Sequence, residues 1–137
     1  MKRPVPLLYW LSLALLVLET GYGIWNVAID LIIRMLPASH SYFDPDLVAF
    51  IAGVSWFQET VFFVGVGAAC VASWLLLGRS VWVLAAYAAH VFLSKLDWLI
   101  SGFSGVEMFA TSGYVSLTYQ TVVMGLLIWL SYRETLD

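Results

Sequence analysis

The sequence predicts an all-α protein, a bundle of four transmembrane helices, and two observations carry this prediction. The 137 residues are 62% hydrophobic and only 11% charged, with a mean hydropathy of +0.91. A soluble domain is usually about 25% charged, and one of this size would leave much apolar surface in water. In addition, four stretches are long enough to cross about 30 Å of hydrocarbon. We therefore expect a single transmembrane domain over residues 1–137.

The four predicted helices cover approximately residues 7–36, 47–77, 80–103 and 114–132. All prolines lie outside these ranges, so none of the helices contains the residue that most strongly breaks a helix. The first range is about twice as long as the apolar region of a signal peptide, and no small-residue cleavage site follows it. We therefore interpret it as a retained helix.

The basic residues set the expected orientation. Lys2 and Arg3 precede the first helix, Arg79 lies between the second and third, and Arg133 follows the fourth. The other two linkers lack Lys and Arg, and only Arg34, near the end of the first helix, lies close to one of them. The positive-inside rule therefore predicts that both termini are cytoplasmic. The sequence does not distinguish a bacterial inner membrane from the endoplasmic reticulum.

Polar side chains recur within the predicted helices at spacings of three, four and seven residues, which place them on shared helix faces. We expect these faces to meet in a polar interior that opens toward the non-cytoplasmic side. Lys95 lies about 140° around its helix from His90, so we expect it to meet another helix or to extend to the membrane surface. The inward-facing polar residues are expected to be Glu19, Tyr22, Asn26, Asp30, Glu59, Tyr87, His90, Asp97, Tyr119 and Gln120.

Three of these residues, Glu19, Glu59 and His90, are expected near the middle of the membrane. An ionised residue at the bilayer centre costs about 2.5–3.5 kcal/mol. Two carboxylates would then cost about 6 kcal/mol, which is comparable to the whole stability of a domain. We expect them to be neutral, hydrated or paired, one of them with Lys95. The sequence has no metal-ligand cluster, phosphate-binding loop or basic patch for nucleic acid, and we expect no metal and no cofactor.

Several short motifs resemble those of the EXPERA family, which includes the sigma-2 receptor and emopamil-binding proteins. They are DLIIRMLP at 30–37, FDP at 43–45, WFQETVFF at 56–63 and YAAH at 87–90. The family has a four-helix core with an aspartate and a Leu-Pro turn in helix one, a loop Asp-Pro, a carboxylate in helix two and Tyr-x-x-His in helix three. The present loops are shorter, and the proline expected after the helix-two carboxylate is missing.

The resemblance implies functional roles for these residues. Asp30 and Glu59 would be the acidic pair that faces a ligand cavity, Asp44 the loop aspartate and His90 the helix-three histidine. Family members bind sterols and amphiphilic amines within the membrane, and some isomerise a sterol double bond. We therefore hypothesise a site for a small hydrophobic ligand (sterol-, isoprenoid- or lipid-like), with Asp30, Glu59 and His90 as candidate catalytic residues and Trp56 among the ligand-binding ones. Whether an isomerase reaction takes place is left open.

Two other functions are compatible with the same residues. Glu, His, Lys and Asp in the middle of a membrane are typical of proton relays, which would indicate a small proton-coupled transporter or channel. Because four helices are few for a complete pathway, such a protein would act as an oligomer. The third alternative is an accessory subunit of a larger membrane complex, in which Lys95 faces an acidic residue of a partner. The expected partners are the lipid bilayer, a hydrophobic ligand, and a second copy or another membrane subunit.

Overall fold

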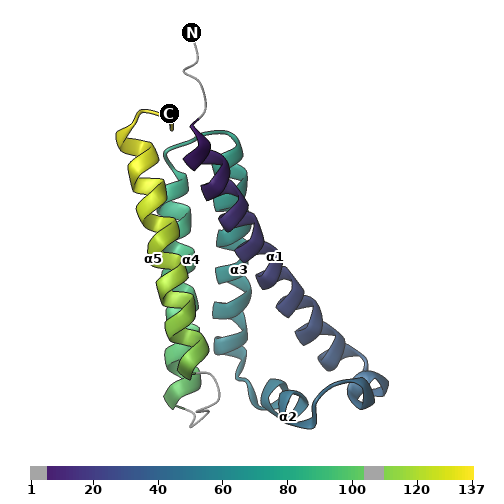
Figure 1. Ribbon diagram of the computed structural model, residues 1–137. Helices are drawn as coiled ribbons and strands as arrows, with labels where there is room; N and C mark the ends of the chain where they lie inside the picture. The colour runs from purple at the N-terminus through teal and green to yellow at the C-terminus, as the bar shows by residue number, and fades with distance from the viewer. Residues whose placement is uncertain (1–5, 104–109) are drawn as a thin grey trace.

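The computed structural model describes residues 6–103 and 110–137, and this part of the chain is α-helical without strands (Figure 1). Four long helices lie along one another, and α1 begins at the end of the bundle where the chain finishes. The two short helices lie at the opposite end, which is called the α2 end below. The predicted all-α four-helix bundle is confirmed. The helices are α1 (Leu7–Met35), η1 (Pro37–Tyr42), α2 (Pro45–Gly53), α3 (Trp56–Leu77), α4 (Val83–Phe103) and α5 (Ala110–Tyr132).

The long helices have the surface of a membrane protein. All four are long and apolar enough to cross a bilayer, and only 17% to 33% of each spanning window is buried within the protein. Large apolar side chains such as Leu18, Trp74 and Phe92 are between 67% and 76% exposed on the outward faces. Lipid is the solvent that covers such faces without cost, because it is as apolar as the side chains. The orientation of the termini stays a prediction.

The helix predicted over residues 47–77 is divided into α2 and α3. Ser55 caps the N-terminus of α3, since its side chain accepts a hydrogen bond from the Gln58 backbone N–H at 3.2 Å. The sequence SWFQ at 55–58 matches a Ser-x-x-Gln capping signal, which the surrounding apolar residues conceal. Glu59 consequently lies in the first turn of α3. The prediction that Glu59 lies in the middle of its span is therefore wrong.

The connection from α1 to α3 follows from prolines and a capping aspartate. Pro37 excludes a helical conformation at Leu36, where α1 ends with φ −126° and ψ 80°. Asp44 caps α2 by accepting a hydrogen bond from the Asp46 backbone N–H at 2.8 Å, and Pro45 occupies the first helical position. Asp44, which the family resemblance matches to the loop aspartate, thus stabilises a helix end here.

The apolar core lies at the end of the bundle opposite to α2. It is completed by the C-terminal tail, in which Leu136 is only 6% exposed. The tail is held by hydrogen bonds from the Asp137 N–H to the Arg79 carbonyl (2.6 Å) and from the Val81 N–H to the Asp137 carbonyl (2.8 Å). Toward the α2 end, α1 diverges from the other helices (Figure 1). The core residues are Tyr9, Leu16, Ala72, Leu76, Val83, Tyr87, Val123, Leu127, Leu130 and Leu136.

Leu16 tests whether this core stabilises the bundle, because none of its side chain is exposed, whereas Leu18 is 67% exposed on the same helix. We expect Leu16→Ala to lower the free energy of unfolding by about 2 kcal/mol, through the cavity that it leaves. The value is at the low end for such a change because lipid also solvates leucine. Leu18→Ala should change it by less than about 0.5 kcal/mol. Thermal unfolding in detergent compares the two, and equal effects would contradict the observed packing.

Candidate functional site

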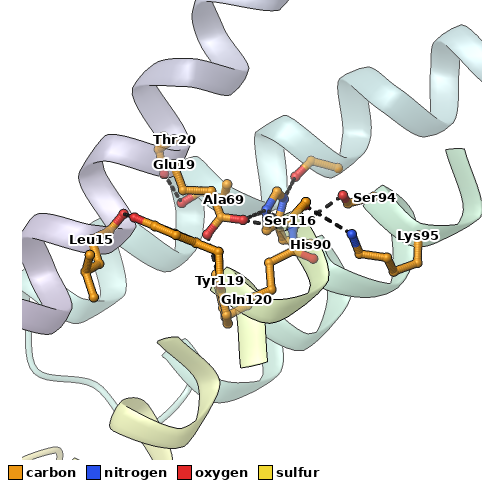
Figure 2. A network of polar contacts seen from close by, with 12 residues as sticks. Leu15, Glu19, Thr20, Ala69, His90, Ser94, Lys95, Ser116, Tyr119 and Gln120 are labelled. Carbon is orange, nitrogen blue, oxygen red and sulfur yellow. Dashed lines mark hydrogen bonds and ion pairs between the residues drawn. The ribbon is translucent and has the colours of Figure 1, made fainter. Parts of the chain in front are cut away.

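A buried polar network joins α1, α4 and α5 around the carboxylate of Glu19 (Figure 2). Glu19 Oε1 accepts a hydrogen bond from Gln120 Nε2 at 2.8 Å and lies 3.0 Å from His90 Nε2, and Oε2 accepts one from the Tyr87 hydroxyl at 2.7 Å. The three partners are 0% to 8% exposed. Glu19 lies 12 residues after Leu7 and 16 before Met35, the ends of α1. It therefore occupies the middle of its span, as predicted.

The hydrogen bonds of His90 fix the position of one proton and leave another shared. His90 Nδ1 lies 2.8 Å from the Gly65 carbonyl oxygen, and a carbonyl only accepts, so Nδ1 carries a hydrogen. The contact between His90 Nε2 and Glu19 Oε1 then requires one proton, bound to either atom. Tyr87 and Gln120 both donate to Glu19, which favours a carboxylate beside a protonated imidazole. The site therefore consists of a hydrogen-bonded acid–base pair with one shared proton.

Contacts on both sides of Glu19 hold α1 in this position. Thr20 Oγ1 donates to the Ala69 carbonyl at 3.3 Å or hydrogen-bonds to Ser73 Oγ at 2.9 Å, which ties α1 to α3. The Tyr119 hydroxyl donates to the Leu15 carbonyl at 2.6 Å, which ties α1 to α5 (Figure 2). Because side chains on either side of Glu19 bond to neighbouring helices, the carboxylate is fixed relative to its three donors.

Gly65 brings α3 close to α4 at the level of His90. A Cβ atom added at Gly65 would lie 3.2 Å from Leu93 Cβ, closer than most such contacts in proteins. The absence of a side chain therefore allows the backbone of α3 to approach the α4 side chains, and the Gly65 carbonyl becomes the acceptor for His90 Nδ1. The sequence gives no signal for this role, because the acceptor belongs to the backbone.

A second cluster, near the α2 end, joins Asp30 and Glu59 through Arg34. Arg34 Nε lies 2.8 Å from Asp30 Oδ1 and 3.0 Å from Glu59 Oε1, and the three side chains are 11% to 26% exposed. Asp30 and Glu59 are thus brought together, as the family resemblance implies, with a cation between them. The four-residue spacing of Asp30 and Arg34 predicted one of these contacts. The contact with Glu59 depends on how α1 packs against α3.

A third cluster lies on α3 and α4, also toward the α2 end. Gln58 Nε2 donates to Asp97 Oδ1 at 3.1 Å and to Ser101 Oγ at 2.8 Å, and the Ser101 hydroxyl lies 3.1 Å from the Asp97 carbonyl, to which it donates. Asp97 was a predicted site residue, whereas its partners Gln58 and Ser101 were not. Their contacts with Asp97 depend on how α3 packs against α4, which helical spacing within one helix does not predict.

Lys95 reaches away from the Glu19 network toward α5. Its Nζ donates to the Gly113 carbonyl at 3.3 Å and to Ser116 Oγ at 3.1 Å, and it lies 6.0 Å from the centre of the Trp98 ring. The prediction that Lys95 meets another helix is confirmed. Among the described residues its partners are a carbonyl, a hydroxyl and an aromatic ring, and no ion pair with Glu19 or Glu59 is formed.

The predicted set of site residues is only partly brought together. Of the three candidate catalytic residues, Asp30 and Glu59 contact Arg34, while His90 contacts Glu19. The sequence therefore located the titratable groups but paired them differently from the structure.

Other predicted residues face away from the interior. Tyr22 is 71% exposed, so the expectation that it faces the interior is wrong, and Trp56, a predicted ligand-binding residue, is 85% exposed. Asn26 donates to the Tyr22 carbonyl within its own helix at 3.0 Å. A step of three residues falls about 60° short of a full helical turn, so Tyr22 lies farther than Glu19 from the buried face of α1. Trp56 is the first residue of α3, and none of the described helices covers its ring.

No family model matches the chain, and neither a curated protein nor a solved structure matches it. The resemblance to the EXPERA family therefore stays a prediction. Within residues 6–103 and 110–137, no group of three or more His, Cys, Asp or Glu side chains is placed to hold a metal ion. The chemistry that the described geometry offers is proton exchange between Glu19 and His90.

The shared proton can be observed by NMR of the protein in lipid nanodiscs, with ¹⁵N-labelled histidine and ¹³C-labelled glutamate carboxyls. We expect His90 Nδ1 to carry a hydrogen that is bonded to the Gly65 carbonyl, and the signals of His90 Nε2 and the Glu19 carboxyl to show one proton shared between them. Glu19→Gln should leave His90 neutral with its hydrogen on Nδ1, whereas Glu59→Gln should leave the His90 signals unchanged. A neutral His90 with its hydrogen on Nε2 would contradict the assignment.

Removal of Arg34 tests the second cluster. We expect Arg34→Met to lower the free energy of unfolding by about 1–3 kcal/mol, between the values typical of exposed and buried ion pairs, because Asp30 and Glu59 lose their shared cation. The double variant with Glu59→Gln should recover part of this loss by removing one of the two facing charges. Arg133→Met, at an exposed position, is the control. Unfolding monitored in detergent gives the comparison, and an Arg34→Met protein as stable as the parent would refute the role of this cation.

Proposed function

We propose that the chain is a proton-coupled membrane transporter or channel, in which Glu19 and His90 bind the proton that is moved. The observation that supports this function is the 3.0 Å contact between Glu19 Oε1 and His90 Nε2, across which two titratable groups share one proton. Uptake of a proton would leave both groups protonated, and release would leave a carboxylate beside a neutral imidazole. Titratable groups in the middle of a membrane span are typical of proton relays.

The groups around the pair are chemically suited to such changes. A tyrosine hydroxyl both donates and accepts hydrogen bonds, so Tyr87 can donate to a Glu19 carboxylate and accept from a protonated Glu19. In each charge state His90 Nδ1 keeps its hydrogen and donates it to the Gly65 carbonyl, which holds the ring while Nε2 gains or loses its proton. A proton added to this network therefore requires reorientation of a hydroxyl rather than movement of a helix.

Binding of a hydrophobic ligand is the second candidate function. It is favoured by the proximity of Asp30 and Glu59, which together with Arg34 form a cluster of net charge −1 that an ammonium group of a ligand would complement. In this hypothesis the ligand competes with Arg34 for the two carboxylates. Native mass spectrometry of the purified protein, with extraction and identification of lipids, would reveal a stoichiometric ligand that is lost in Asp30→Asn or Glu59→Gln.

Proton movement is tested with the purified protein in liposomes that enclose a pH-sensitive dye and carry a potassium ionophore to remove the membrane potential. An imposed pH gradient should decay faster than in protein-free liposomes. Glu19→Gln, which keeps the shape of the side chain but cannot share the proton, should slow this decay by about a hundredfold or more, as expected for loss of a positioned acid–base group. Glu134→Gln, which removes one carboxylate from the exposed end of the chain, is the matched control.

Two results of this experiment would overturn the proposal. One is a gradient that decays no faster with the protein than without it. The other is a Glu19→Gln protein that is folded, as judged by its thermal unfolding, and moves protons at the rate of the parent.

A further inference from the structure

A polar stripe runs along α4 from the Glu19–His90 pair to the α2 end. His90, Ser94, Asp97 and Ser101 are separated by four, three and four residues, so they lie on one face of the helix. The stripe extends about 16 Å along the helix axis. It ends close to the first turn of α3, where Gln58 contacts Asp97 and Ser101 at 3.1 and 2.8 Å.

The stripe connects to the Glu19–His90 pair through Gln120. Gln120 Nε2 lies 2.8 Å from Glu19 Oε1 and 3.4 Å from Ser94 Oγ, so one amide group touches both the pair and the stripe. Figure 2 shows Gln120 and Ser94 at this junction, with Lys95 turned aside toward Ser116. The charge of Lys95 therefore lies beside the stripe and not on it.

The other end of the bundle offers no comparable connection in the part of the chain that the structure describes. Beyond Tyr87 the core consists of side chains such as Leu16, Leu76 and Leu127, none of which is exposed. The buried hydroxyls there do not bond to the Glu19 network: the Tyr9 hydroxyl donates to the Leu76 carbonyl, the Ser12 hydroxyl donates to the Leu8 carbonyl, and Thr20 and Ser73 bond to each other. The pair therefore lies between an apolar end and a polar end.

The Gln120 carboxamide gives an independent sign that water enters this region. Its Oε1 atom is buried and has no hydrogen-bond partner among the described residues, although the side chain is only 2% exposed. Rotating the amide by half a turn would leave its NH₂ group in the same position instead, so one end of the amide lacks a partner in either assignment. Buried polar groups are nearly always hydrogen-bonded, and a bound water molecule is the usual partner where the protein provides none.

From the stripe, the apolar opposite end and the Gln120 carboxamide, we infer that Glu19 and His90 exchange protons with water from the α2 end alone, along a hydrated route on which Asp97 relays the proton. This inference rests on the proposed function and adds a direction and a second titratable group. Ser94 and Asp97 are about one helical turn apart, or about 5 Å, and one water molecule spans such a distance with two hydrogen bonds of about 2.8 Å.

The titratable groups that face this route come from three helices. Glu19 of α1 and His90 of α4 lie at its inner end, together with Tyr87, which bonds to Glu19. Asp97 lies at its outer end, where its only described side-chain partner is the neutral Gln58. Tyr119 of α5 is directed to the Leu15 carbonyl instead. An acid at the outer end that has no cation beside it among the described residues is the group that can pass protons between water and the inner pair.

Access is tested by single cysteines and a membrane-impermeant thiol reagent, in a Cys70→Ala protein reconstituted in liposomes. Ser94→Cys and Ser101→Cys report whether the reagent enters the route, and Ser12→Cys reports whether it enters the apolar end. Ala38→Cys, at an exposed position in η1, shows from which side of the membrane the reagent reaches the α2 end. We expect Ser94→Cys and Ser101→Cys to react from the side on which Ala38→Cys reacts, and Ser12→Cys to stay unmodified from both sides. Two cysteine positions on the route are used so that the test still holds if one of the substitutions disturbs folding.

The same labelling result decides the inference separately from the proposed function. If Ser94→Cys and Ser101→Cys react no faster than Ser12→Cys, or react from the opposite side, the route is refuted even when Glu19→Gln abolishes proton flux. For the relay, Asp97→Asn should slow proton flux by about a hundredfold, while the shared proton between Glu19 and His90 persists. Asp46→Asn, an exposed acid in α2, is the control. Unchanged flux in Asp97→Asn would remove Asp97 from the route.

Discussion

The arrangement of the bundle depends on the need to surround one carboxylate with donors in the middle of the membrane. Glu19 receives hydrogen bonds from Tyr87 and Gln120 and shares a proton with His90, all within 3.0 Å. The surrounding lipid tails offer no hydrogen-bonding group that could replace any of these partners. The lengths of these side chains therefore fix the separation of α1, α4 and α5 at this level. The apolar core at the end opposite to α2 must pack in a way that is compatible with that separation.

This requirement divides the molecule into two unlike halves. On one side of Glu19 the helices close around leucines and valines, and the C-terminal tail completes the core. On the other side α1 diverges, and the contacts between helices become polar: Arg34 with Asp30 and Glu59, and Gln58 with Asp97. Polar contacts in a membrane are each worth only about 0.6–2 kcal/mol, so the second half is held less tightly than the first. The proposed proton movement requires such a half, because a uniformly packed bundle excludes water.

The sequence was sufficient to predict the fold class and most of the titratable groups in the interior. Length and hydropathy identified the four spans, the cost of burying a charge drew attention to Glu19 and Glu59, and helical spacing drew attention to His90 and Asp97. The division at Ser55 was hidden, because a capping residue inside a long apolar run has little effect on hydropathy. Glu59 was therefore placed too deep in the membrane.

The pairing of the site residues was beyond what one sequence can show. Helical periodicity states which residues share a face, but not the rotation of one helix relative to the next, and that rotation determines whether His90 meets Glu19 or Asp30. Residues spaced three apart on one helix also differ by about 60° in direction, which is why Tyr22 was expected inside and lies outside. Gly65 contributes through a backbone carbonyl and so leaves no trace in the pattern of polar side chains.

The distance along the chain between Glu19 and its partners has a consequence for biosynthesis. Tyr87, His90 and Gln120 follow Glu19 by 68, 71 and 101 residues. When α1 leaves the ribosome and enters the bilayer, none of these residues has yet been inserted, and Gln120 belongs to the last helix. The nascent helix must therefore accept Glu19 in hydrocarbon without a partner, at a cost of about 2.5–3.5 kcal/mol for an ionised side chain. The 29 residues of α1, longer than the usual span of about 20, supply the additional apolar length that makes insertion of this helix favourable before the bundle assembles.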